Sequence, residues 1–198
     1  MKREPVPGYD LPVTELEGPA AVDEAAVRRQ YEELTLLLLA QGRSITAMES
    51  CTSGQIASLL TDTEGASAVF KGSFVAYSNE AKVRMGVNPR VIEEYGVYSP
   101  QTAAVMAQAC RAAFGAELGV GVTGSFGNAD PSNADSRPGE VFFALDAAEG
   151  TECFHCTVPA QPSRLAYKLW IADIIADCVR AACRRSHSAC GLVAEGGQ

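Results

Sequence analysis

Residues 44–60 read SITAMESCTSGQIASLL, and this stretch decides the fold. It opens with a short apolar run, passes through a polar turn at 49–54, and returns to apolar residues at helical spacing. A strand that leads directly into a helix is the building unit of an α/β fold. Ligands of such folds bind beyond the carboxyl ends of the parallel strands, so the polar turn is the first candidate site.

The same alternation continues along the chain. The patterns predict strands at 44–48, 73–77 and 118–122 and a β-hairpin at 140–146 and 151–158. They predict helices at 23–40, 52–62, 80–85, 89–95, 100–114 and 163–185, the fifth begun by Ser99 and ended by Gly115. Because the hairpin must be antiparallel, we expect a three-layer α/β/α sandwich with a mixed, mainly parallel sheet of about five or six strands.

The chain divides into three parts by composition. Residues 1–22 contain four prolines (Pro5, Pro7, Pro12 and Pro19) and predict an extended or disordered arm. Residues 23–186 hold all the expected helices and strands and form one domain. Residues 187–198 are expected to be a frayed tail.

Composition narrows the class of protein. The 198 residues are 47% hydrophobic and 20% charged, which is typical of a globular protein, and their formal net charge is −8. This acidic balance disfavours binding to nucleic acid or to anionic membranes. No apolar run approaches the roughly 20 residues of a membrane span, and no secretory signal follows Met1, so we expect a cytoplasmic protein.

The chain has seven cysteines, an odd number, and they do not fall in two pairs at the spacing of a zinc site. Cys153 and Cys156 have the C-x-x-C form, which is found in metal and redox sites. If they lie on a strand, however, their side chains point to opposite faces of the sheet. We expect buried, reduced thiols and predict neither a metal nor a cofactor.

Ser50 is the candidate nucleophile, because it lies between a strand and a helix where backbone N–H groups can stabilise an oxyanion. Ser50 or Thr52 could instead be only the N-cap of that helix. Cys51 is a rival nucleophile, since a helix N-terminus lowers the pKa of a thiol.

A nucleophilic serine needs a base. His155 and His187 lie on the hairpin and in the tail, away from the strand ends, so a Ser-His-Asp triad is not expected. Lys82 follows the second strand, and burial or a nearby cation could lower its pKa enough for a base, with Tyr77 orienting it. Alternatively, Lys82 is solvated surface.

Three segments together resemble a known family. Glu49-Ser50-Cys51-Thr52-x-Gly54, Tyr77-Ser78-Asn79-x-x-Lys82 and Val122-Thr123-Gly124 resemble, in this order, the C-terminal domain of the CinA proteins. The resemblance extends over about residues 31–183 and includes the stand-alone nicotinamide mononucleotide deamidases.

The resemblance implies an amidohydrolase that converts nicotinamide mononucleotide into nicotinate mononucleotide and ammonia. It implies Ser50 as nucleophile and Lys82 as base, assisted by Tyr77, without a metal. The implied substrate-binding residues are Glu49, Cys51, Thr52, Thr123, Gly124 and Arg164. The implied partners are a pyridine nucleotide and further copies of the chain, as a homodimer or a higher homo-oligomer.

The sequence also departs from the family pattern. Ser53 replaces a glycine after the nucleophile, Phe126 replaces an alanine, and Asn128 replaces a proline. Lys168 replaces an arginine, and Pro162 and Ser163 replace a glycine and an aspartate before Arg164. The alternatives to the deamidase are therefore an amidase with another substrate or a nucleotide-binding protein without turnover.

Overall fold

The computed structural model describes residues 11–131, 133 and 136–191, with side chains up to residue 185. Its sheet has the strand order β1-β6-β5-β4-β2-β3. Every strand runs parallel to the others except β5, which is antiparallel to both of its neighbours. The mixed, mainly parallel sheet is thereby confirmed. The strands are β1 (Val13–Leu16), β2 (Ile45–Glu49), β3 (Phe70–Val75), β4 (Leu118–Gly124), β5 (Glu140–Ala147) and β6 (Gly150–Thr157).

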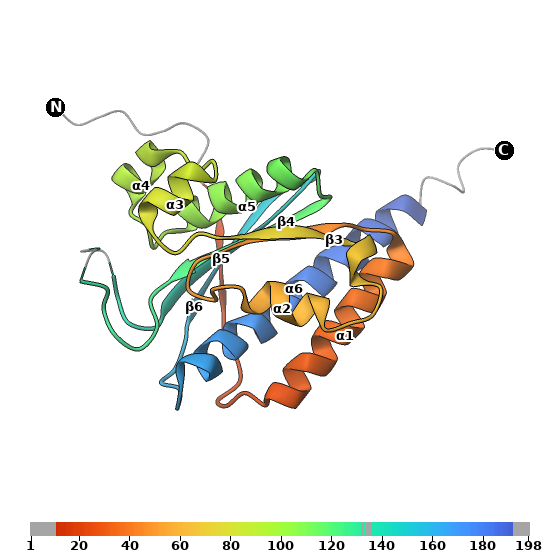
Figure 1. The fold of residues 1–198 in the computed structure, drawn as a ribbon, viewed down its shortest axis with the longest axis horizontal. Coiled ribbons are helices and arrows are strands. Elements are labelled where there is room, and N and C mark those ends of the chain that lie inside the picture. The colour runs from red at the N-terminus through yellow and green to blue at the C-terminus, as the bar shows by residue number, and fades with distance from the viewer. Residues whose placement is uncertain (1–10, 132, 134–135, 192–198) are drawn as a thin grey trace.

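Helices cover both faces of the sheet, which confirms the three layers (Figure 1). One face carries α1 (Glu24–Gln41), α2 (Gln55–Thr61) and α6 (Arg164–Gly191), and the larger apolar core lies beneath them. The other face carries α3 (Asn79–Arg84), α4 (Pro89–Tyr95) and α5 (Pro100–Phe114). A short 3₁₀ turn at Ala66–Ala68 precedes β3.

Helix α5 packs unusually close to the centre of the sheet. A side chain at Gly121 would come within 2.2 Å of the backbone oxygen of Ala103, and one at Gly119 within 2.3 Å of that of Ala107. The two glycines of β4 and the alanines of α5 therefore allow direct backbone contact between helix and strand. The cap geometry agrees with the prediction, because Ser99 accepts a hydrogen bond from the Thr102 N–H and Gly115 has a φ of +61°.

The predicted arm and tail contain regular structure next to the domain. The expected arm contains β1, which extends the sheet by pairing with β6, and the backbone oxygen of Pro19 accepts a hydrogen bond from the Trp170 indole at 2.7 Å. At the other end, α6 continues to Gly191, so the expected tail begins as helix. Residues 1–10 and 192–198 lie outside the described part of the chain.

The cysteine prediction can be checked on β6. Cys153 packs with the alanines of α5, whereas Cys156 belongs to the core on the α6 side, so the two thiols lie on opposite faces. Between them, the His155 ring contacts the carboxylates of Glu15 and Glu140 at 2.5 and 2.7 Å. Within the described ranges, no group of three or more His, Cys, Asp or Glu residues is arranged to hold a metal ion.

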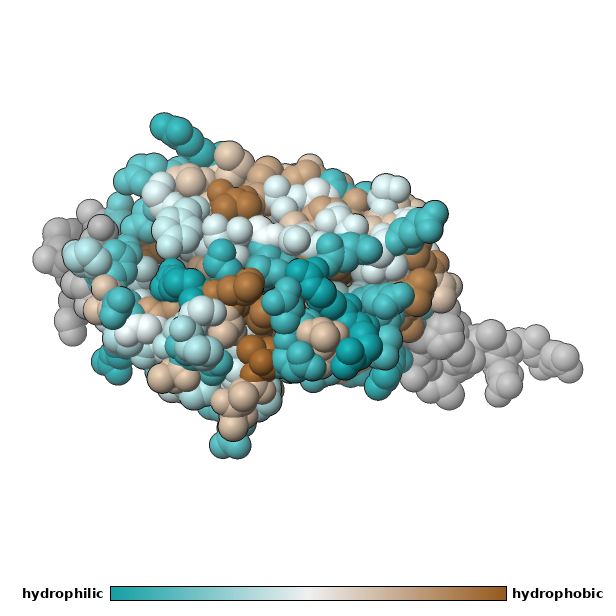
Figure 2. Space-filling model, turned by 60° about the horizontal axis from the view of Figure 1, so that its bottom comes forward, coloured by the Kyte–Doolittle hydropathy of each residue, from teal (hydrophilic) through white to brown (hydrophobic). Residues whose placement is uncertain are grey.

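The surface of the helical layer is mostly polar. On the face seen in Figure 2, hydrophobic residues form small separate areas among hydrophilic ones. Of the Leu36–Leu39 run, only Leu36 is exposed, because Leu38 is in the core and the other two are partly buried. This run therefore does not provide a broad apolar surface for contact between copies of the chain. The predicted self-association stays a prediction. None of the described helices combines the length and apolar character that spanning a membrane requires.

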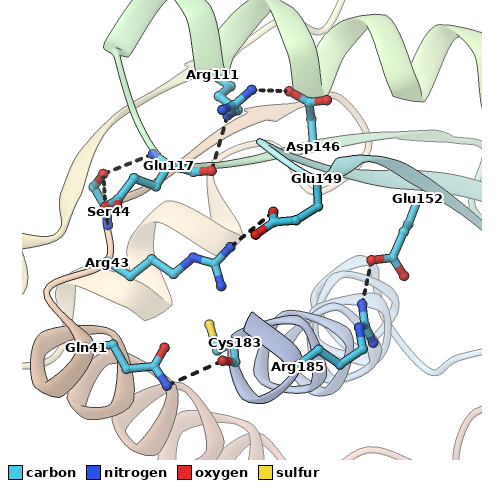
Figure 3. A network of polar contacts seen from close by, with 10 residues as sticks. All are labelled: Gln41, Arg43, Ser44, Arg111, Glu117, Asp146, Glu149, Glu152, Cys183 and Arg185. Carbon is cyan, nitrogen blue, oxygen red and sulfur yellow. Dashed lines mark hydrogen bonds and ion pairs between the residues drawn. The ribbon is translucent and has the colours of Figure 1, made fainter. Parts of the chain in front are cut away.

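Paired charges gather at the edge of the sheet where the parallel strands begin (Figure 3). The Glu117 carboxylate accepts hydrogen bonds from the N–H and the hydroxyl of Ser44, and Arg111 binds Asp146 at 3.1 Å. A cavity of about 340 Å³ opens nearby, flanked by the ion pairs Arg43–Glu149 and Arg185–Glu152. We call this end of the sheet the amino edge.

Candidate functional site

Ser50 and Lys82 meet at the opposite end of the sheet, which we call the carboxyl edge. Ser50 follows β2 directly, and Lys82 lies on α3, shortly after the neighbouring strand β3. The Lys82 Nζ is 3.0 Å from the Ser50 Oγ, and both side chains are buried. The structure therefore rules out the alternative in which Lys82 is solvated surface.

The surroundings of Lys82 suit a base. Its Nζ also donates to the backbone oxygens of Ala76 and Tyr77, at 3.1 and 3.4 Å. Burial lowers its pKa from 10.5 to about 8, although the negative charges of Asp130 and Glu80 act in the opposite direction. With a pKa near 8, about one lysine in ten is neutral at pH 7, against roughly one in 2,500 for an exposed lysine.

Cys51 is a poor competitor for the role of nucleophile. Its thiol is buried, and burial raises its pKa to about 12. The thiolate, which is the reactive form, is then nearly absent at neutral pH. We expected the helix N-terminus to lower the pKa of the Cys51 thiol, but the effect of burial is larger and raises it.

Glu49 is bonded to the backbone around the start of α2. Its buried carboxylate accepts hydrogen bonds from the backbone N–H groups of Gly54, Ile56 and Ala57, at 3.0, 3.1 and 2.9 Å. Gly54 is the N-cap residue of α2, and Ile56 and Ala57 belong to its first turn, so Glu49 caps that helix from the end of β2. These three N–H groups are therefore not available to an oxyanion, and the N-cap residue is Gly54 rather than Ser50 or Thr52.

The turn between β2 and α2 is strained at one residue. Ser53 has a φ of +53°, in the left-handed region that glycine adopts most easily. This is the position where the family pattern has a glycine, so the departure keeps the backbone conformation at some cost. Thr52 is buried, and its Oγ1 has no hydrogen-bond partner among the described residues.

Tyr77 contributes to the site through its backbone. Its carbonyl oxygen accepts from Lys82, whereas its side chain is 62% exposed. The phenol oxygen accepts a hydrogen bond from Arg164 at 3.4 Å. The peptide group of Tyr77 thus contacts Lys82, whereas its ring lies beside Arg164, and the assisting role of Tyr77 stays a prediction.

Arg164 is the first residue of α6, and its guanidinium packs against an aromatic ring. Its guanidinium carbon lies 5.3 Å from the centre of the Phe126 ring, which itself stacks on Tyr167. Such a contact holds a guanidinium in place without cancelling its charge. The large side chain that replaces the family alanine thus supports Arg164.

A cavity of about 260 Å³ connects these groups, and Phe126 does not fill it. Its lining includes the predicted residues Ser50, Cys51, Tyr77, Gly124 and Arg164, together with Phe126. It also includes Tyr98, Ser125, Asn128, Ala129 and Asp130, which the sequence analysis did not select. The polar composition of the loop after β4 was the available signal, but it did not single out a residue.

Thr123 lies outside this lining. Its hydroxyl donates to the Val97 oxygen at 2.9 Å and so joins β4 to the segment before α5. The lack of a side chain at Gly124 allows β5 to pack closely against the end of β4, since a Cβ there would lie 2.7 Å from the backbone oxygen of Glu140. Thr123 therefore has a structural role, and Gly124 belongs to the cavity wall.

A buried serine–lysine pair beneath a polar cavity, at the carboxyl edge of a three-layer α/β sandwich, defines the class of this protein. Residues 28–170 match the CinA C-terminal domain. The chain belongs to the CinA C-terminal domain family, as its motifs indicated.

Curated relatives are named competence-damage inducible proteins. A competence-damage inducible protein of Desulforudis audaxviator is 34% identical over 164 residues, which cover 70% of this chain and 40% of the relative. One from Halothermothrix orenii is 41% identical over 121 residues, which cover 60% of this chain and 29% of the relative. The chain thus corresponds to well under half the length of these relatives.

Solved structures agree on the fold. The competence/damage inducible protein CihA of Agrobacterium tumefaciens superposes with a TM-score of 0.73 at 28% identity, covering 81% of this chain and 98% of that one. A CinA superfamily protein of Klebsiella pneumoniae gives a TM-score of 0.74 at 18% identity, covering 80% and 98%.

Proposed function

We propose that the protein is an amidohydrolase that deamidates nicotinamide mononucleotide to nicotinate mononucleotide and ammonia. The observation that carries the proposal is the 3.0 Å contact between the Lys82 Nζ and the Ser50 Oγ in a buried setting. A lysine with a pKa near 8 can act as a base at neutral pH, which an exposed lysine cannot.

In the first half of the reaction, neutral Lys82 takes the proton of the Ser50 hydroxyl while Oγ attacks the carboxamide carbon. The tetrahedral intermediate carries its negative charge on the former carbonyl oxygen. It collapses when the Lys82 ammonium gives its proton to the departing nitrogen, which leaves as ammonia. The acyl group of nicotinate mononucleotide, with its ribose and phosphate, is then an ester of Ser50.

In the second half, Lys82 is again neutral and takes a proton from a water molecule that attacks the ester carbon. The ester bond breaks, Ser50 regains its proton from Lys82, and the acid product leaves. The anion-binding role falls to Arg164, whose planar fork matches phosphate oxygens and whose position in the cavity wall is supported by Phe126.

The test is ammonia release from nicotinamide mononucleotide by the purified protein and its variants. Ser50→Ala should lower kcat by at least about 10³-fold, because the covalent step is lost. Ser58→Ala, which changes an exposed serine of α2, is the matched control and should keep wild-type activity. Cys51→Ala should also keep most of it.

Two outcomes would reject the proposal. A folded wild-type protein that releases no ammonia would exclude this substrate and favour another amide or binding without turnover. Full activity in Ser50→Ala would exclude the serine mechanism. Mass spectrometry of the quenched reaction adds a direct measurement, since an ester of nicotinate mononucleotide with Ser50 should be present in the wild type.

A further inference from the structure

Asp130 brings a carboxylate to the cavity that contains Ser50. It lies in the loop between β4 and β5, where sequence patterns gave no reason to choose it. Its Oδ2 accepts hydrogen bonds from the Tyr98 hydroxyl at 2.7 Å and from the Asn133 amide at 2.6 Å. Its backbone N–H donates to the Ser136 hydroxyl at 2.7 Å. The carboxylate is therefore oriented by its neighbours.

The hydrogen bonds continue to the helix that carries the base. The Asn133 Oδ1 accepts from the Asn79 side chain at 3.0 Å, and Asn79 is the first residue of α3. Tyr98 belongs to the segment immediately before α5. Asp130 is thus held from two separate elements. The donors Tyr98 and Asn133 are both neutral, so their hydrogen bonds orient the carboxylate without adding a positive charge.

The cavity wall consequently contains fixed charges of both signs. Arg164 supplies the positive one and Asp130 the negative one. The negative charge of Asp130 reaches the Ser50–Lys82 pair, because it acts to raise the pKa of Lys82. Charges in a partly enclosed cavity interact more strongly than they would in water. A ligand that carries an anion and a separate cation matches such a wall better than a simple anion does.

We propose that Asp130 is a specificity-determining residue that selects a substrate with a positively charged ring next to the scissile amide. This inference rests on the proposed function, since it concerns the same cavity. Nicotinamide mononucleotide has the required charges, a cationic pyridinium ring and a phosphate. A neutral molecule of the same shape, with the same sugar and phosphate, should bind more weakly.

The experiment compares two ligands of matched shape. One is nicotinamide mononucleotide, and the other is the benzamide C-riboside 5′-phosphate, in which carbon replaces the charged ring nitrogen. Dissociation constants are measured by calorimetry on Ser50→Ala protein, so that no turnover intervenes, and KM and kcat are measured on protein with Ser50 intact.

Asp130→Asn keeps the shape and the hydrogen-bond acceptor but removes the charge. We expect it to weaken the affinity for the cationic ligand by about 10- to 100-fold and that for the neutral ligand by less than about 3-fold. Asp130→Glu should restore part of the preference. Asp62→Asn, which removes a surface carboxylate paired with Arg28, is the control and should change neither affinity.

The outcomes separate this inference from the proposed function. Equal weakening for both ligands would assign Asp130 to the sugar hydroxyls or to the loop structure and would overturn the selection of charge. Preferential binding of the cation that depends on Asp130, without ammonia release by the wild type, would uphold the inference and reject the deamidase. Deamidation by a protein that binds the two ligands equally well would support the deamidase and reject the inference about Asp130.

Discussion

The two edges of the sheet handle charge in opposite ways. At the amino edge, arginines meet carboxylates, as in the pair Arg111–Asp146 at 3.1 Å (Figure 3). At the carboxyl edge, the buried Lys82 meets a hydroxyl and two carbonyl oxygens, all of them neutral. A paired charge stays charged and supports the fold, whereas a buried cation with neutral partners is pushed toward its neutral form.

The comparison of the two edges indicates which property identifies a candidate site. Both edges have a cavity, and the one at the amino edge is larger, at about 340 Å³ against 260 Å³. Size therefore does not identify the site. The carboxyl edge is distinguished by Lys82, a titratable group whose pKa is lowered to about 8 and which contacts the Ser50 hydroxyl.

Replacing Lys82 gives the largest expected effect and tests the comparison directly. Lys82→Met should lower kcat/KM by about 10²- to 10⁴-fold, the usual contribution of a positioned base. In the wild type, activity should rise with pH and level off above about pH 8, where Lys82 becomes neutral. Lys71→Met, at an exposed lysine of β3, is the control and should keep both the rate and the pH profile.

The same variant should be more stable than the wild type near neutral pH. Because the folded state lowers the pKa of Lys82, protonation favours the unfolded chain, and the wild type carries the full destabilisation below about pH 8. Lys82→Met should therefore raise the free energy of unfolding by about 1–3 kcal/mol at pH 7. The gain should shrink as pH rises from 8 toward 10.5. A gain that does not change with pH would show that Lys82 carries no burial penalty.

Glu49 tests whether a polar residue at the carboxyl edge serves the fold or the ligand. Glu49→Ala leaves three N–H groups of α2 without their acceptor and should cost about 2–4 kcal/mol in urea unfolding. Glu49→Gln should cost less, since the amide oxygen still accepts. Glu32→Ala, at an exposed position of α1, should stay within about 0.5 kcal/mol of the wild type. A raised KM with unchanged stability would restore the predicted role in substrate binding.

Sequence patterns predicted the elements that pack and the residues that follow adjacent strands. Ser50 and Lys82 could be linked because parallel neighbours β2 and β3 end at the same edge of the sheet. The pattern missed β1, whose four residues lie on an edge and are mostly exposed, so they show no hydrophobic alternation. Its pairing with β6 depends on a contact across about 140 residues of sequence, such as Glu15 with His155.

Roles that depend on partners far along the chain escaped prediction. Glu49 stands in a motif of polar residues, and only its distances to α2 reveal that it is a cap. Asp130 is one of several polar residues in its loop, and its position in the cavity follows from hydrogen bonds to Tyr98 and Asn133. Local sequence determines which side chains are available, and the tertiary fold determines which of them face the cavity.

Replacing Arg111 tests the amino edge and gives the smallest expected effect. Its side chain is 29% exposed and that of Asp146 is 9% exposed, so the pair is partly screened by solvent. Arg111→Met should lower the free energy of unfolding by about 1 kcal/mol, because Asp146 keeps its hydrogen bond from Thr151 at 2.6 Å. The kcat/KM for ammonia release should stay within about twofold of the wild type, because Arg111 lies at the edge of the sheet opposite Ser50 and Lys82. A double-mutant cycle with Asp146→Asn isolates the pair itself. A large loss of activity in folded Arg111→Met would mean that the two edges are coupled, and the division between a stabilising edge and a reactive edge would then be wrong.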